Sequence, residues 1–254
     1  MGWLPEKLYP EIGAGGFSRV DGTVEFYGRV NSLLTRDMTV LDFGAGRGRE
    51  VLEDQAPYRR ALRLLKGKAA KVIGVDVDPI VLSNPSLDEA MVITEDGALP
   101  VEDASIDVIV SDFCFEHLRH PERVAGQFHR VLKMGGWICA RTPNRWGYIG
   151  LGATLVPNQL HHAALRRLQP QRRALDVFPT VYRLNTRRAV RRCFPPEDYR
   201  DCSYTINSIP AYCGNSLPGA WVCKRMVSLL PESVSTTLLI FLQKRAPTRA
   251  GERR

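Results

Sequence analysis

Short apolar runs alternate with amphipathic stretches through the first 144 residues. Five runs have the length and composition of buried strands, at residues 40–43, 71–75, 90–93, 106–110 and 136–140. Between the last two runs, residues 121–133 repeat apolar side chains at helical spacing, and a glycine pair ends that pattern. Strand patterns that alternate with helix patterns predict a parallel sheet covered by helices.

The pattern changes after residue 144, where five prolines interrupt the next 56 residues. Two short helices are predicted there, at 159–169 and at 186–193, and Thr186 is a candidate cap for the second. A strand at 202–208, a helix near 218–229 and a strand at 236–243 follow. We therefore divide the chain into an N-terminal helix and α/β core at 1–144, an insertion at 145–200, closing strands at 201–243 and a disordered basic tail at 244–254.

Composition excludes several classes of protein. With 44% hydrophobic and 24% charged residues, the chain is not mainly disordered, and no apolar run approaches the roughly 20 residues that span a bilayer. No basic region precedes an apolar one at the N-terminus, so no signal peptide is expected. The six cysteines lack zinc-site spacing. We expect reduced thiols, no metal site and a cytoplasmic protein.

A glycine-rich turn is the strongest local signal. Gly44, Gly46 and Gly48 follow an apolar run and precede a helix, which lets the backbone approach a ligand closely. A dinucleotide-binding loop would need its third glycine at position 49, which is Arg49. Asp42 stands just before the glycines, where a carboxylate suits a ligand with an amino group and a cationic centre better than a phosphate.

Acids follow the next two strand candidates as well. Asp76 comes directly after the second run, where a carboxylate can accept hydrogen bonds from both hydroxyls of a ribose. Asp96 follows the third run and can accept from an exocyclic amine. Because parallel strands end at the same edge of a sheet, the three acids predict a site for a nucleoside-containing ligand.

These segments resemble the class I S-adenosylmethionine-dependent methyltransferases, in particular the small-molecule branch that includes the ubiquinone-type O-methyltransferases. The resemblance covers about residues 22–144 and rests on four motifs and two landmarks, at 41–48, 72–79, 96–100, 103–111, 115–118 and 131–137. It implies a Rossmann-like α/β fold, with a seven-stranded, mostly parallel sheet whose last strand is antiparallel. A helical lid is expected between strands five and six, and the implied cofactor is S-adenosylmethionine.

The resemblance implies a set of cofactor-binding residues. They are Asp42, Gly44, Ala45, Gly46, Gly48, Asp76, Val77, Asp96, Gly97, Ala98 and Ser111. The helix expected at 23–34 adds two candidates: Tyr27 to stack or hydrogen-bond, and Arg29 to meet the cofactor carboxylate. Ordinary packing and a surface charge are the competing interpretations of these two.

The sequence indicates the acceptor site less clearly than the cofactor site. His117 is a candidate base, but it belongs to a Glu-His-Leu triplet that looks like a structural landmark of the family. Tyr182 and Arg183 are candidates on the insertion, and Arg183 is the residue we expect to recognise an acidic acceptor. Met134 replaces the family's usual proline, and residues 53–68 are longer than the family needs.

Charge is unevenly distributed. The net charge is +8, yet residues 1–150 hold 18 basic against 21 acidic residues and residues 151–254 hold 17 against 6. The basic second part predicts an anionic acceptor, while a solvated arginine-rich surface is the competing interpretation. The two short insertion helices suit a substrate lid, or a weak peripheral contact with an anionic membrane.

We thus predict transfer of a methyl group to a small molecule, at an oxygen of an anionic metabolite, glycan precursor or lipid-linked intermediate. A nucleic-acid methyltransferase is the alternative that charge favours. The Pro-Pro-aromatic signature of enzymes that methylate amino groups of nucleic acids is absent after residue 112, which argues against it. A dehydrogenase, or a catalytically silent subunit that binds the cofactor in a partner complex, would also fit parts of the pattern. The oligomeric state stays open.

Overall fold

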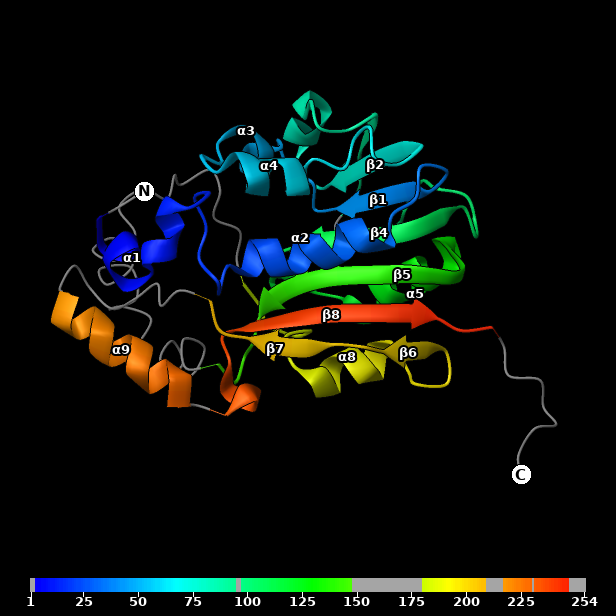
Figure 1. Cartoon of the computed structure of the whole chain (residues 1–254). Coiled ribbons are helices and arrows are strands. Elements are labelled where there is room, and N and C mark those ends of the chain that lie inside the picture. Colours follow the sequence, from blue (N-terminus) through cyan, green and yellow to red (C-terminus); the bar gives the residue numbers. More distant parts are fainter. Residues whose placement is uncertain (1–2, 95–96, 148–179, 209–216, 230, 247–254) are drawn as a thin grey trace.

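A single sheet organises the chain in the computed structural model, which describes residues 3–94, 97–147, 180–208, 217–229 and 231–246 (Figure 1). The strands are β1 (Thr39–Phe43), β2 (Lys71–Asp76), β3 (Glu89–Val92), β4 (Ile106–Asp112), β5 (Leu132–Pro143), β6 (Tyr199–Asp201), β7 (Tyr204–Ile206) and β8 (Thr237–Lys244). Their order is β3-β2-β1-β4-β5-β8-β6, and β7 also pairs with β8. Strands β1 to β5 are parallel and β8 runs antiparallel to β5, which confirms the predicted sheet.

The strand predicted at 202–208 forms two short strands instead. Both β6 and β7 pair with β8 in one continuous register, from Tyr199 opposite Lys244 to Ile206 opposite Thr237. Between them, the Asp201 side chain accepts a hydrogen bond from the backbone N–H of Ser203 (2.9 Å), which interrupts the strand assignment without changing the register. The described part of the sheet therefore has eight strands rather than the predicted seven.

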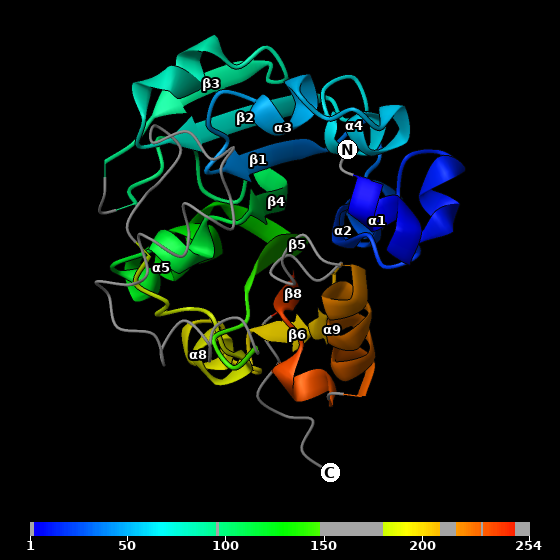
Figure 2. The ribbon, with the colours of Figure 1, turned by 90° about the vertical axis from the view of Figure 1, so that its left-hand side faces the viewer.

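Helices cover both faces of the sheet (Figure 2). Helices α2 (Gly22–Leu33), α3 (Arg49–Leu52) and α4 (Pro57–Arg63) lie on one face, and α5 (Pro121–Val131) and α8 (Arg187–Cys193) lie on the other. Helices α1 (Trp3–Leu8) and α9 (Leu217–Leu229) pack together at the end where the parallel strands finish. Short 3-10 helices occur at Pro10–Gly13, Pro79–Ser83, Phe115–His117 and Glu232–Val234.

Local sequence explains the two helices closest to the site. The Asp21 side chain accepts hydrogen bonds from the N–H groups of Thr23 (2.9 Å) and Val24 (3.1 Å), and so caps α2. Phe26 and Val30 are buried one turn apart on the sheet side of α2. Helix α5 buries its apolar positions against the opposite face, as its periodicity predicts.

The last part of the insertion expected at 145–200 packs on the sheet. Thr186 caps α8 as predicted, by accepting a hydrogen bond from Ala189 N–H (3.1 Å). Val190 on this helix and Phe194 after it are buried in the same cluster as the sheet strands. The helix predicted at 159–169 lies outside the described residues. No helix in the described part of the chain is long and apolar enough to cross a membrane.

Lys244, expected to begin the disordered tail, is instead the last residue of β8. Its side chain is buried, and its ammonium group donates hydrogen bonds to the carbonyl groups of His129 (2.6 Å) and Leu132 (2.9 Å). These carbonyls lie at the C-terminal end of α5, where a cation is favourable. The end of β8 is therefore anchored to the helix layer.

Candidate active site

The glycine loop between β1 and α3 is held from two sides. The N–H groups of Gly44 and Ala45 donate to the Val75 carbonyl (2.8 and 3.2 Å). The Asn84 side-chain amide donates to the carbonyls of Ala45 (3.0 Å) and Gly46 (3.1 Å). All three glycines of the loop have positive φ. A Cβ on Gly44 would stand 2.7 Å from the Cys114 sulfur, whereas one on Gly46 would meet no described atom within 4 Å, so Gly46 faces open space.

Asp76 is fixed beside this loop at the end of β2. One carboxylate oxygen accepts from Gly46 N–H (2.9 Å) and the other from Asp78 N–H (3.0 Å). Each oxygen keeps a lone pair for a ligand. Asp76 also lines a cavity of about 130 Å³ together with Gly44, Val77 and Gly97. Asp96 lies outside the described residues, and Ala98, next to Gly97, is exposed.

Asp42 lies at the end of β1, next to the glycine loop. Burial, and then the charges of Asp112 and Asp76, raise the pKa of its carboxyl group to about 7. A carboxyl group that is shielded from water among other acids is the counterpart of a positively charged ligand group. Asp42 and Asp76 thus flank the loop with two carboxyl groups, which suits a ligand that combines hydroxyl groups with a cationic group.

Next to Asp42 lies a group of residues that we call the buried ion cluster: Tyr27, Arg63, Asp112 and Arg141. Arg141 binds Asp112 through two guanidinium nitrogens, one of them at 2.8 Å, and the Tyr27 hydroxyl donates to Asp112 (3.1 Å). Burial would raise the pKa of Asp112, but Arg141 and Arg63 hold it below its usual value. Burial and the nearby Asp112 raise the pKa of Tyr27 well above its usual value. Asp112 is therefore ionised and Tyr27 neutral at neutral pH.

Two of the predicted cofactor-binding residues, Arg29 and Ser111, form hydrogen bonds with other parts of the protein. Arg29 donates to Glu25 (3.1 Å) and to the Tyr204 hydroxyl on β7, with about half of its side chain exposed. Arg29 therefore lies with β7 rather than with the glycine loop, because residues two positions apart on a helix face nearly opposite directions and Tyr27 takes the inward one. Ser111 is fully buried, and its hydroxyl donates to the Phe43 carbonyl (3.0 Å), so it ties β4 to β1 beneath the loop.

The three catalytic candidates, His117, Tyr182 and Arg183, lie in segments near the cavity that Asp76 lines. His117 and Arg119 line it together with Asp76. The N–H of Tyr182 donates to the Glu116 carbonyl (3.1 Å), and Tyr182 has a positive φ of 50°. The exposed Arg183 donates to the Arg119 carbonyl (2.7 Å), and most of the expected lid lies outside the described residues. Of the three candidates, His117 thus lines the cavity itself, whereas Tyr182 and Arg183 contact the backbone of Glu116 and Arg119 next to His117.

Sequence reasoning missed four residues that shape the site. Asn84 supports the glycine loop from below, and Arg63, Asp112 and Arg141 form most of the buried ion cluster. Arg141 did carry a signal, because it follows the apolar run 136–140 where a buried strand continues. The pairing of Arg141 with Asp112 could not be predicted, because it depends on the β4–β5 register that places the two residues opposite each other.

Known proteins are similar to this chain in sequence. A methyltransferase-domain family model matches residues 21–194. A probable S-adenosylmethionine-dependent methyltransferase of Mycolicibacterium smegmatis is 34% identical over 101 residues, which are 39% of this chain and 39% of that protein. Malonyl-[acyl-carrier protein] O-methyltransferase 1 of Coxiella burnetii is 29% identical over 136 residues, 54% of this chain and 43% of that protein. The chain thus spans less than half the length of these curated relatives.

A solved structure shows the likeness of fold. The methyltransferase bound to the Trm112 activator of Haloferax volcanii aligns with a TM-score of 0.53 and 19% identity, covering 90% of this chain and 92% of that one. At this identity the likeness concerns the fold alone. The family match covers more than half of the chain and includes the glycine loop, Asp76 and the buried ion cluster. The chain therefore belongs to the methyltransferase-domain family.

Proposed function

We propose that this chain is an S-adenosylmethionine-dependent methyltransferase that acts on a small molecule. The observation that carries the proposal is the pair of carboxyl groups, Asp42 and Asp76, on either side of a glycine loop that has open space at Gly46. When bound, the cofactor supplies an electrophilic methyl group on a sulfonium centre. A nucleoside with an amino-acid side arm has the ribose hydroxyls and the cationic groups that this donor set suits.

In this proposal, the chain's own residues bind the cofactor and orient it. Asp76 would hold the ribose, since Gly46 and Asp78 fix its carboxylate and leave lone pairs unused. Asp42 would face the ammonium group, and the backbone of residues 44–48 would lie along the amino-acid portion. The buried ion cluster supports this edge of the sheet in a fixed arrangement. Methyl transfer needs chiefly such positioning and the exclusion of water.

For the acceptor, we propose an oxygen of an anionic small molecule, in particular a carboxylate. The Coxiella relative is named as an O-methyltransferase of malonyl-[acyl-carrier protein]. A carboxylate is ionised at neutral pH and attacks without a general base. Near the cavity of Asp76, Arg183 donates to the carbonyl of Arg119, a lining residue, and so offers a positive charge for an anionic acceptor.

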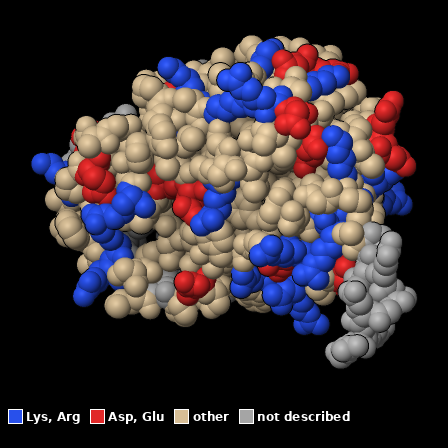
Figure 3. Space-filling model, turned by 45° about the vertical axis from the view of Figure 1, so that its right-hand side comes forward, with Lys and Arg blue, Asp and Glu red and all other residues tan. Residues whose placement is uncertain are grey.

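The arginines of α8 give less support to an anionic acceptor. The part of the surface that carries α8 and β6 is rich in Lys and Arg (Figure 3). Arg191 pairs there with Asp201 (3.3 Å) and Arg192 with Glu122 (3.2 Å), both at the surface. Exposed pairs of this kind contribute little and face solvent.

The decisive test is methyl transfer. Purified protein with methyl-labelled S-adenosylmethionine should label dicarboxylic acids or acyl thioesters of dicarboxylic acids in a fractionated extract. The product should lose its label under mild alkaline hydrolysis, because a methyl ester is cleaved and a methylated amine or ring carbon is not. Alkali-stable label would refute the carboxylate acceptor, and no binding of S-adenosylhomocysteine in calorimetry would refute the methyltransferase assignment itself.

A further inference from the structure

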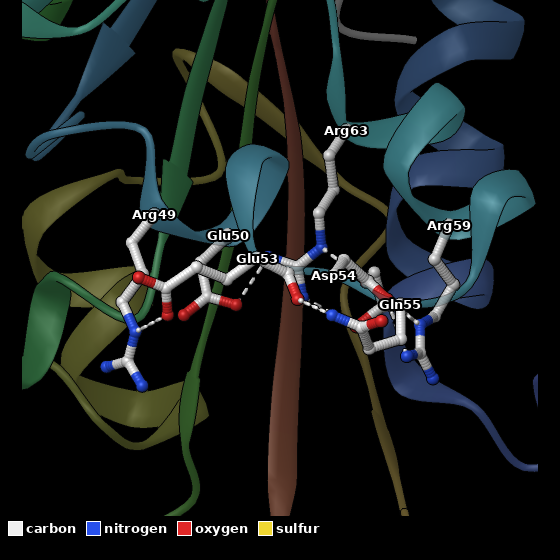
Figure 4. Close-up of a pocket in the computed structure, with 8 residues that line it drawn as sticks. Arg49, Glu50, Glu53, Asp54, Gln55, Arg59 and Arg63 are labelled. Carbon is white, nitrogen blue, oxygen red and sulfur yellow. Dashed lines mark hydrogen bonds and ion pairs between the residues drawn. The ribbon is translucent and has the colours of Figure 1, made fainter. Parts of the chain in front are cut away.

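A second, larger cavity lies between the start of α2 and the α3–α4 segment (Figure 4). Its volume is about 460 Å³, and its walls are mostly charged. Arg59 and Arg63 come from α4, Glu50 from α3, and Asp54 from the turn between the two helices. The cavity adjoins the buried ion cluster because Arg63 belongs to both.

Arg63 is buried but incompletely hydrogen-bonded. Only 8% of its side chain is exposed. One terminal nitrogen donates to the Thr23 hydroxyl (3.1 Å), and the other lies 3.1 Å from Glu50 and 3.6 Å from Asp112. Its Nε–H has no hydrogen-bond partner within the described residues, and the Asp54 carboxylate is 3.8 Å away. Because Asp54 lies beside Nε, the guanidinium can take a further oxygen ligand at its terminal nitrogens, of which Nη1 is held by the exposed Glu50.

The charged side chains around Arg63 differ in burial and in the number of their partners. Arg59 binds Asp54 through two nitrogens and also donates to Asp21 (2.9 Å), and the Asp54 side chain is almost completely buried. Glu50, in contrast, is 65% exposed and stands on a helix of four residues. An ion pair with one exposed partner is weak, so the Glu50 carboxylate can leave Arg63 at small cost.

We propose that Arg63 is a receptor for a ligand carboxylate and that Glu50 occupies this receptor in the ligand-free protein. The ligand carboxylate displaces Glu50 from Nη1 and makes two parallel hydrogen bonds with the two terminal nitrogens, Nη1 and Nη2, each of which carries two hydrogens. Glu50 thus acts as a built-in competitor. The inference rests on the proposed function, which supplies two sources of a carboxylate: the amino-acid portion of the cofactor and the acceptor.

Binding measurements without turnover test the proposal. Calorimetry would compare S-adenosylhomocysteine with methylthioadenosine, which lacks the amino-acid portion, and would then titrate malonate into protein saturated with S-adenosylhomocysteine. The variants are Glu50→Gln, which removes the competitor, and Arg63→Lys, which keeps the charge but loses the planar donor pair. Glu53→Gln is the matched control, since Glu53 lines the same cavity but pairs with Arg47 (2.8 Å) and Arg49 (3.0 Å).

The two variants should change affinity in opposite directions. Glu50→Gln should tighten binding of the carboxylate probe roughly two- to fivefold, and Arg63→Lys should weaken it roughly tenfold or more. If the cofactor is the source, S-adenosylhomocysteine responds and methylthioadenosine does not. If the acceptor is the source, only malonate responds.

Three results would contradict the assignment. Unchanged affinities for both S-adenosylhomocysteine and malonate in Glu50→Gln would overturn it, and this exposed substitution does not endanger folding. An equal response in Glu53→Gln would reduce the effect to general electrostatics and would also overturn it. Failure of the unaltered protein to bind either adenosine compound would instead refute the proposed function.

Discussion

Asp112 keeps its charge beside Asp42 and thereby raises the pKa of Asp42. Arg141 and Arg63 hold the pKa of Asp112 below its usual value despite its burial, whereas burial and the charge of Asp112 raise the pKa of Asp42 to about 7. The two carboxyl groups end neighbouring parallel strands, yet their surroundings separate their protonation states. A cationic ligand group at Asp42 would reverse this effect, because it favours the carboxylate form.

Cofactor affinity should therefore rise with pH. Below about pH 7 the ligand must bind against a protonated Asp42, and above it against a carboxylate that attracts the ammonium group. Calorimetry with S-adenosylhomocysteine at pH 6 and pH 8 should show tighter binding at pH 8. In Asp42→Asn the difference should shrink, and an undiminished difference would exclude Asp42 as its source.

The same group should make the ligand-free protein less stable as pH rises. The folded-state pKa of Asp42 is raised, so the folded protein binds this proton more tightly than the unfolded chain does. The stabilisation is complete below the unfolded pKa of about 4 and is lost as pH rises through about 7. Thermal unfolding from pH 5 to pH 8 should show a smaller decline in Tm for Asp42→Asn than for the unaltered protein.

Asp76→Ala should weaken binding of S-adenosylhomocysteine by about one to two orders of magnitude, because charge-assisted hydrogen bonds to the ribose contribute about 1.5–3 kcal/mol. Asp103→Ala is a suitable control, since Asp103 is an exposed acid that pairs with Arg130 (2.6 Å) away from the loop. Equal affinity of a folded Asp76→Ala protein would remove Asp76 from the site.

Features that depend on local sequence were predictable here, and those set by tertiary pairing were not. The apolar runs place β1 to β5 within a few residues, and the acids after β1 and β2 locate the strand edge. Asp112 and Arg141 are 29 positions apart and meet only through the β4–β5 register. Arg63 and Asn84 come from segments between strands that have no strong periodicity, so their positions under and beside the loop could not be inferred.

Arg141 should be essential for stability. It is almost fully buried and neutralises Asp112. Arg141→Met would remove the bidentate partner of Asp112 and leave only Arg63 (3.6 Å) and the Tyr27 hydroxyl beside the carboxylate. Breaking a buried pair in this way costs about 3–5 kcal/mol of unfolding free energy. The double variant Arg141→Met/Asp112→Asn should recover part of this loss, because it removes the Asp112 charge as well. Urea denaturation of four proteins, the unaltered one, Arg141→Met, Asp112→Asn and the double variant, measures the coupling, and additive losses would show that the two side chains do not interact.

Two glycine substitutions should act in opposite directions and so separate loop geometry from general stability. Gly48 has a φ of 74°, and a Cβ there would stand 2.4 Å from the Asn84 side-chain oxygen. Gly48→Ala should therefore push Asn84 away from the Ala45 and Gly46 carbonyls. This should weaken binding of S-adenosylhomocysteine and also lower stability.

Gly28 is exposed in the middle of α2, and a Cβ there would meet no described atom within 4 Å. Gly28→Ala should raise stability by up to about 1 kcal/mol, since alanine favours the helix, and leave affinity unchanged. Calorimetry and urea denaturation on both variants check this contrast, and unaltered affinity in a folded Gly48→Ala protein would mean that the loop tolerates displacement of Asn84.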